Sequence, residues 1–176
     1  MPTSAPNTPK RTPPTVALRP VTGDNWQAVV RLTLAPGQED FVASNVYSLA
    51  QAAYQLGLIP LAVYATSAGY GSADESATEP VETLVGFAMY SRLPDELGRH
   101  WIFRVMFDQS QQGKGYGRAT MLLLLERMRA TIPDLRTITL DFNQRNHVAE
   151  ALYESLGFVK TGEMEEDEVV ASLPVG

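Results

Sequence analysis

The stretch that decides the fold of this chain is WIFRVMFDQSQQGKGYGR, residues 101–118. Its first part, residues 101–107, is a short apolar and aromatic run, which predicts a buried strand. The residues that follow are polar and rich in glycine, and residues 119–128 are rich in Leu, Met and Ala, which favours a helix. The stretch therefore predicts a strand, a polar turn, a glycine loop and the start of a helix.

The glycine loop removes side chains from three alternate positions, Gly113, Gly115 and Gly117. In such a loop, backbone N–H groups can point outward together at the positive end of a helix dipole. This arrangement makes an anion site that is suited to a diphosphate. A tight turn that binds nothing is the alternative, and the glycine spacing alone leaves both interpretations open.

Two common phosphate loops do not fit these residues. The Rossmann pattern requires glycine where Arg118 stands, and the Walker pattern requires Ser or Thr after Lys114, where Gly115 stands. The pattern that does fit is Gln-x-x-Gly-x-Gly, formed by Gln112, Gly115 and Gly117. Together with the preceding strand and the following helix, it resembles the acetyl-CoA motif of the GNAT superfamily of N-acetyltransferases.

Two further stretches carry this resemblance, which extends over residues 16–173. Residues 146–158, NHVAEALYESLGF, resemble the family's helix with Asn, Ala, Leu-Tyr and then Gly-Phe. Residues 38–51 and 104–108 resemble a bacterial subgroup, the spermine/spermidine acetyltransferases. The resemblance implies acetyl-CoA as cosubstrate and a cationic amine as acceptor.

The resemblance also implies roles for individual residues. Residues 105–107 are expected to bind the pantetheine arm in the manner of a neighbouring strand, Asn146 to touch the cosubstrate, and Tyr153 to face the departing sulfur as the catalytic residue. The expected cosubstrate-binding residues are Val105, Met106, Phe107, Gln112, Gly113, Lys114, Gly115, Tyr116, Gly117, Arg118 and Asn146.

The spacing of Asn146 and Tyr153 supports this pairing independently, because residues seven apart on a helix share one face. The alternatives are a helix N-cap for Asn146 and a core tyrosine with a satisfied hydroxyl for Tyr153. Many members of the family place a glutamate on the central strand, where this chain has Phe103 and Arg104. The general base is therefore unassigned.

An acceptor amine needs such a base, because a lysine-like amine is neutral in only about one molecule in two thousand at pH 7. Glu39, Asp40 and Asp141 are candidates for this base by location, acting through water, and they are also the candidate substrate-binding residues. Glu39-Asp40 and the acidic run at residues 163–168 are either solvated turns or groups that attract a polycation.

Composition narrows the class of function. The chain has 176 residues and a formal net charge of −6, which argues against nucleic-acid binding and favours a cationic partner. It has no cysteine, and neither His100 nor His147 has neighbours typical of a catalytic relay or a metal site. The sequence shows no membrane-length apolar segment and no signal-peptide pattern. We expect a cytoplasmic protein with no metal, no membrane contact and no nucleic-acid partner; a homodimer is left open.

The chain order predicts a Pro/Thr/Ser-rich disordered tail at residues 1–14 and one N-acetyltransferase domain at residues 15–176. The expected fold class is α/β (α+β), a single mixed sheet of about six to seven strands with a splayed central parallel pair and helices on both faces. Strands are expected at 16–21, 61–66, 84–90, 101–107, 136–142, from 158, and at 169–173; helices at 27–32 (capped by Asp24), 41–55, 119–128 and 146–156; and a loop at 67–79.

The predicted function is acetyl-CoA-dependent transfer of an acetyl group to a primary amine, by direct attack in a ternary complex. A polyamine such as spermidine or spermine is the favoured acceptor. The alternatives are another small-molecule amine, a protein amine, a non-catalytic acetyl-CoA sensor, or a small interaction module with an unoccupied glycine loop.

Overall fold

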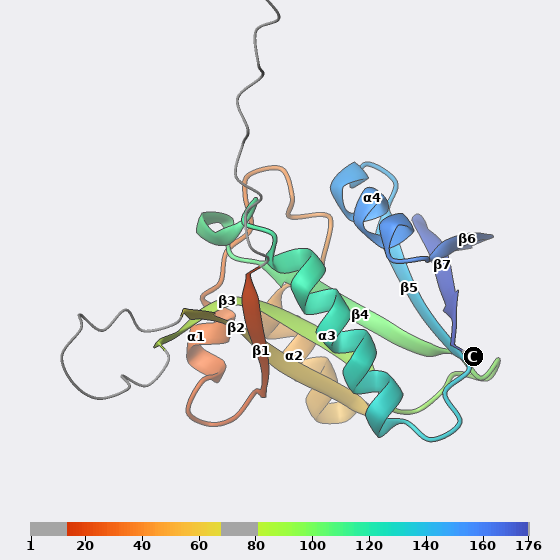
Figure 1. Cartoon of the computed structure of the whole chain (residues 1–176), viewed down its shortest axis with the longest axis horizontal. Coiled ribbons are helices and arrows are strands. Elements are labelled where there is room, and N and C mark those ends of the chain that lie inside the picture. The colour runs from red at the N-terminus through yellow and green to blue at the C-terminus, as the bar shows by residue number, and fades with distance from the viewer. Residues whose placement is uncertain (1–13, 68–80, 176) are drawn as a thin grey trace, which may run out of the picture.

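The computed structural model describes residues 14–67 and 81–175. The predicted tail, apart from Pro14, and nearly all of the predicted loop at 67–79 lie outside these described residues. The described chain forms one mixed sheet with helices packed against both faces (Figure 1). The predicted fold class is confirmed.

The sheet has seven strands in the order β1-β2-β3-β4-β5-β7-β6, and only β4 and β5 are parallel neighbours. The strands are β1 (Thr15–Pro20), β2 (Leu58–Ser67), β3 (Val81–Ser91), β4 (His100–Phe107), β5 (Thr137–Asn143), β6 (Val159–Glu165) and β7 (Glu168–Pro174). The helices are α1 (Trp26–Val30), α2 (Asn45–Tyr54), α3 (Tyr116–Thr131) and α4 (His147–Ser155), with a short 3-10 turn, η1 (Gln109–Gln111).

The sheet separates two apolar clusters. The α3-side cluster contains Met121, Leu124, Leu125 and Met128 of α3 together with residues of the central strands. The α2-side cluster is smaller and includes Val29 of α1. Figure 1 shows α3 crossing one face of the sheet while α1 and α2 lie behind it. Within residues 14–67 and 81–175, no helix is long and apolar enough to cross a membrane.

The parallel pair separates part of the way along its length. β4 is paired with β5 only from His100 to Ile102, opposite residues 138–140. At the same point the β3–β4 register shifts, because Met89 faces Arg104 while Tyr90 faces Ile102, so Phe103 is an extra residue in β4. Such a bulge bends a strand and re-aims its side chains. Residues 103–107 of β4 are therefore left with one edge unpaired.

The start of α2 differs from the prediction. The helix begins at Asn45 rather than at residue 41, because the Ser44 hydroxyl caps it by accepting a hydrogen bond from the Tyr47 N–H at 3.2 Å. Asn45 and Ser48 form its buried face, whereas Tyr47 and Tyr54 are 59% and 93% exposed. The Asn45 side chain donates to the Val29 carbonyl at 2.8 Å, and this bond to α1 selects the buried face.

The start of α1 is also different. Asn25, rather than Asp24, occupies the N-cap position, and its side chain accepts from the Thr22 N–H at 2.8 Å instead of capping the helix. The helix ends at Val30, two residues earlier than predicted.

Replacement of Gly86 tests how closely β3 and β4 approach beside the unpaired edge. A Cβ atom at Gly86 would lie 2.4 Å from the Met106 carbonyl oxygen and 2.8 Å from a ring carbon of Phe107. Because the nearest atom belongs to the backbone, we expect Gly86→Ala to lower the free energy of unfolding by about 1–3 kcal/mol, measured by denaturant titration. Gly23→Ala is the control, since nothing lies within 4 Å of a Cβ there. Equal denaturation midpoints for Gly86→Ala and Gly23→Ala would contradict the expected clash of a residue 86 side chain with β4.

Candidate active site

A cavity of about 510 Å³ lies where β4 and β5 separate. Its walls come from the loop before α2, from β4, β5 and α4, and from the β6–β7 hairpin. Arg104 is the only basic side chain among the described residues that line it. Its lining includes six carboxyl groups, those of Glu39, Asp40, Asp141, Glu165, Glu166 and Glu168. The cavity is therefore strongly acidic.

Asp141 and Glu168 form a carboxyl pair inside this cavity. Asp141 of β5 faces Val170 of β7, and Asn143 faces Glu168, so the two acids are diagonal neighbours on one face of the sheet. Their side chains are hydrogen-bonded to each other. Burial raises the pKa of Glu168 to about 7, the negative charge of Asp141 adds to this rise, and Arg104 opposes it.

Burial also raises the pKa of Asp141, while its own backbone N–H and the Arg104 charge oppose the rise. Two nearby carboxyl groups that share a proton titrate as a pair. The pair therefore retains a proton at pH values at which surface carboxyl groups are ionised.

Arg104 enters the cavity from the bulged part of β4. Its Nε donates to the Ser48 hydroxyl of α2 at 3.3 Å, and a terminal nitrogen donates to the Phe103 carbonyl at 2.6 Å. Burial lowers its pKa, and the carboxylates of Asp141 and Glu168 oppose that change. Since both of these hydrogen bonds go to neutral oxygens, the guanidinium charge is available to the acidic side chains of the cavity.

Tyr153 of α4 combines a core role with a place at the cavity. Its ring lies 5.7 Å from Phe142 and 5.9 Å from Phe158, and the residue is 9% exposed. It also lines the cavity. Burial raises its pKa, and the charges of Asp141 and Glu168 raise it further, so the hydroxyl stays protonated and can donate a hydrogen bond.

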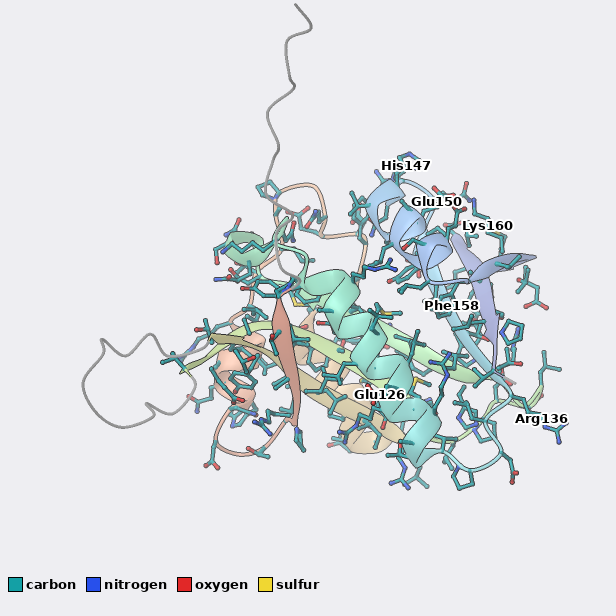
Figure 2. The ribbon with its side chains drawn as sticks, in the orientation of Figure 1. Glu126, Arg136, His147, Glu150, Phe158 and Lys160 are labelled. Carbon is teal, nitrogen blue, oxygen red and sulfur yellow. The ribbon has the colours of Figure 1, made fainter. Side chains whose placement is uncertain are left out.

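The position of α4 depends on a cluster of charges on its outer side. Glu150 is paired with Lys160 of β6 and with His147 at the start of the helix; all three are labelled in Figure 2. Asn146 caps α4 by accepting a hydrogen bond from the Ala149 N–H at 3.1 Å, and it also lines the cavity. The predicted N-cap alternative is thus observed, and Asn146 lines the same cavity as Tyr153.

The glycine loop has the geometry of an anion site. Gly113 and Gly115 have φ angles of 73° and 88°, which favour glycine, and α3 starts at Tyr116 directly after them. In the described part of the chain, the backbone N–H groups of residues 113–118 have no hydrogen-bond acceptor. These free donors at the positive end of a 16-residue helix fit a diphosphate.

The side chains around this loop point elsewhere. Lys114 donates to Gln111 at 2.9 Å, Arg118 donates to Ser155 at 2.7 Å, and Tyr116 packs against the α3-side cluster. A Cβ at Gly117 would meet Leu152 at 3.4 Å, an ordinary contact, so this glycine is under no backbone strain. The donors that the loop offers to a ligand are therefore backbone groups.

The expected pantetheine edge is only partly free. Met106 is buried in the α2-side cluster, while Val105 and Phe107 pack on the opposite face. The Phe107 carbonyl accepts a hydrogen bond from the Gln112 side chain at 3.1 Å. Gln112 also exchanges hydrogen bonds of 2.8 and 3.2 Å with Gln38, which connects the glycine loop to the loop before α2.

The two predicted acidic clusters differ in structure. Glu39 and Asp40 both line the cavity, and Asp40 forms an exposed ion pair of 3.3 Å with Arg145. The cluster at residues 163–168 is divided, because Glu165, Glu166 and Glu168 line the cavity whereas Glu163 pairs with Arg99 at 2.7 Å.

Sequence reasoning did not single out Glu168 or Arg104 as individual members of the site. Glu168 lay inside an acidic run that is typical of a solvated turn, and Arg104 was noted only because it stands where a glutamate was expected. Among the described residues, no three His, Asp or Glu side chains are grouped in a way that could hold a metal ion.

Comparison with known proteins agrees with this architecture. Residues 43–158 match the acetyltransferase (GNAT) family. The chain therefore belongs to the GNAT family of acetyltransferases, and it is an acyltransferase enzyme. It is 27% identical over 155 residues to the spermine/spermidine N(1)-acetyltransferase of Bacillus subtilis (strain 168), with 85% of this chain and 91% of that protein covered.

Two solved structures show the same fold. The spermidine N-acetyltransferase from Vibrio cholerae, in complex with CoA and spermine, has a TM-score of 0.65 and 16% identity, with 92% of this chain and 95% of that chain covered. The aminoglycoside acetyltransferase AAC(6')-Ib, in complex with coenzyme A, has a TM-score of 0.66 and 17% identity, with 91% and 95% covered. At these identities the likeness establishes the fold alone.

Proposed function

We propose that this enzyme transfers an acetyl group from acetyl-CoA to a primary amine of a polyamine such as spermidine or spermine. The observation that carries the proposal is the cavity between the separated strands, which is lined by six carboxyl groups and one arginine. A polyamine carries several spaced positive charges and complements such a surface. The polyamine acetyltransferases among the relatives support this choice of acceptor.

Two of the residues that would hold acetyl-CoA, Val105 and Asn146, line the same cavity. Backbone N–H groups from Gln112 to Arg118 would bind the diphosphate, and the unpaired edge at residues 105–107 would bind the pantetheine arm. Asn146 would contact the thioester end. When bound, acetyl-CoA supplies an activated acetyl thioester.

Tyr153 would act on the departing sulfur. An ordinary tyrosine, with a pKa near 10, gives a proton to a thiolate of pKa about 8.5 at a cost of about 2 kcal/mol. Burial and the carboxylates of Asp141 and Glu168 raise the Tyr153 pKa, so this cost is higher here. A hydrogen bond from the hydroxyl stabilises charge on the sulfur as it develops, and the charge of a bound polycation offsets that of the carboxylates.

A small amine that also carries an anionic group is the second candidate acceptor. Arg104 favours it, because Arg104 lines the cavity and, among the described residues, its side chain donates only to the neutral oxygens of Ser48 and Phe103. The surrounding carboxyl groups favour the polyamine instead.

Charge reversal beside the glycine loop tests the acetyl-CoA site. Lys114 is exposed and its backbone lies in the loop, so Lys114→Glu should raise the Kd for acetyl-CoA about tenfold, or about 1.4 kcal/mol, by calorimetry. Arg136→Glu makes the same charge change near the opposite end of α3, where Figure 2 labels Arg136, and should leave Kd unchanged. Equal effects of both variants would exclude the loop as the diphosphate site.

Removal of the Tyr153 hydroxyl separates its two roles. Tyr153→Phe keeps the ring contacts with Phe142 and Phe158, so the unfolding temperature and the Kd for acetyl-CoA should both equal those of the wild type. Turnover, measured as release of free thiol, should fall about 10²-fold or more if the hydroxyl acts on the leaving group. Turnover within about threefold of the wild type would leave Tyr153 as a packing residue only.

The acceptor is tested by salt and by charge removal. Since the screening length falls from about 10 Å at 0.1 M to about 3 Å at 1 M salt, the KM for spermidine should rise with salt more than the KM for acetyl-CoA. Glu39→Gln with Asp40→Asn should raise the spermidine KM more than about tenfold. Glu126→Gln with Asp134→Asn, two exposed acids outside the cavity lining, is the charge-matched control.

A monoamine that is acetylated faster than spermidine, with no salt dependence, would reject the polyamine assignment. It would leave the acetyltransferase activity intact.

A further inference from the structure

The cavity holds two kinds of carboxyl group. Glu39, Asp40, Glu165 and Glu166 are exposed at its mouth, whereas Asp141 and Glu168 are half-buried between β5 and β7. The inner two are also the carboxylates whose charges raise the Tyr153 pKa, so they lie within electrostatic reach of the expected leaving-group donor. The inner pair and Tyr153 therefore border one space.

We propose that Glu168, positioned by its hydrogen bond to Asp141, is the general base that takes the proton from the acceptor ammonium. This inference rests on the proposed function, since it names the residue that prepares the amine. It goes beyond the sequence-based candidates, which included Asp141 but not Glu168. Asp141 acts here as a positioning residue.

The proton balance of the step is complete. The ammonium loses one proton to a Glu168 carboxylate oxygen, the freed nitrogen pair forms the N–C bond to the acetyl carbon, and the C–S bond breaks. The nitrogen loses its second proton as the amide forms. One proton ends on the sulfur through the Tyr153 hydroxyl, and the other passes to solvent, so an amide, a free thiol and one proton are produced.

The groups that face Glu168 from each neighbouring element explain why it suits this role. They are Asp141 of β5, Arg104 of β4, Glu165 of β6, Glu166 of the hairpin turn and Tyr153 of α4. Burial, the charges of Asp141 and Glu166 and the hydrogen bond to Asp141 raise the Glu168 pKa to about 7, and the Arg104 charge opposes this rise. A base with a pKa near the working pH is available in its ionised form and still binds a proton effectively.

Opposite charge changes at two neighbours of Glu168 give a sharp test. The kcat of the wild type should rise with pH, and the midpoint of this rising limb of the pH profile should lie near neutrality. Asp141→Asn removes a negative neighbour, lowers the Glu168 pKa and should move the limb to lower pH. Arg104→Gln removes a positive neighbour, raises the Glu168 pKa and should move the limb to higher pH.

Glu168→Gln should abolish the limb and lower kcat about 10²-fold or more, with the Kd for acetyl-CoA unchanged. Glu165→Gln, on the same hairpin at the cavity mouth, is the matched control: the acceptor KM should rise while the kcat limb stays. A Glu168→Gln variant that keeps the limb and most of its kcat would overturn this assignment and leave the acetyltransferase proposal standing.

A wild type that acetylates no polyamine would instead overturn the proposed acceptor. The profiles are then measured with the amine that the enzyme does acetylate, so the two failures are distinguishable.

The pH dependence of stability gives a readout that does not depend on activity. Because the folded-state pKa of Glu168 is raised from about 4.5 to about 7, the folded protein keeps a proton that the unfolded chain releases. The stabilisation of the folded state by this proton is fully present below pH 4.5, and it is lost as the pH rises through about 7. The unfolding temperature of the wild type should therefore fall more between pH 5 and 8 than that of Glu168→Gln. Parallel curves would show that the pair does not hold this proton.

Discussion

The separation of β4 from β5 after the Ile102–Leu140 pair is the constraint on which the site depends. Up to that pair, parallel hydrogen bonds join the two halves of the sheet; beyond it, residues 103–107 have an unpaired edge. The bulge at Phe103 coincides with this point and sends Arg104 into the cavity. One local irregularity thus leaves an open strand edge for a ligand, makes the cavity and places the one basic side chain that lines it in the described part of the chain.

Charge in the cavity is arranged by depth. In the proposed function, the exposed carboxylates at the mouth attract a cationic acceptor through their field, and solvent screens them. The half-buried pair of Asp141 and Glu168 is less solvated, so its proton affinity is set by burial and by close neighbours. Attraction of the acceptor and removal of its proton are therefore assigned to different carboxyl groups of the same acidic surface.

The strand, loop and helix at residues 101–131 were predictable because their signals are local. An apolar run, two glycines with positive φ and a leucine-rich segment each specify their own backbone. The predicted start of α2 was wrong, because polar hydrogen bonds rather than hydrophobic periodicity set it. The Ser44 cap begins the helix after the loop, and the Asn45 bond to the Val29 carbonyl turns a polar face inward. The cap is local and polar, whereas the Asn45 bond joins residues 16 apart, and a hydrophobic pattern reveals neither.

The sequence by itself determined the family, the order of the elements and the acidic character of the chain, because these follow from motifs, periodicity and composition. The tertiary structure alone decided which acids act together. Asp141 and Glu168 are 27 residues apart in the chain, and only the antiparallel register of β5 and β7 makes them diagonal neighbours. The same register places Glu168 half-buried at the cavity, whereas Glu163 of β6 pairs with Arg99 outside it. Burial and proximity set a pKa, and both are properties of the folded sheet.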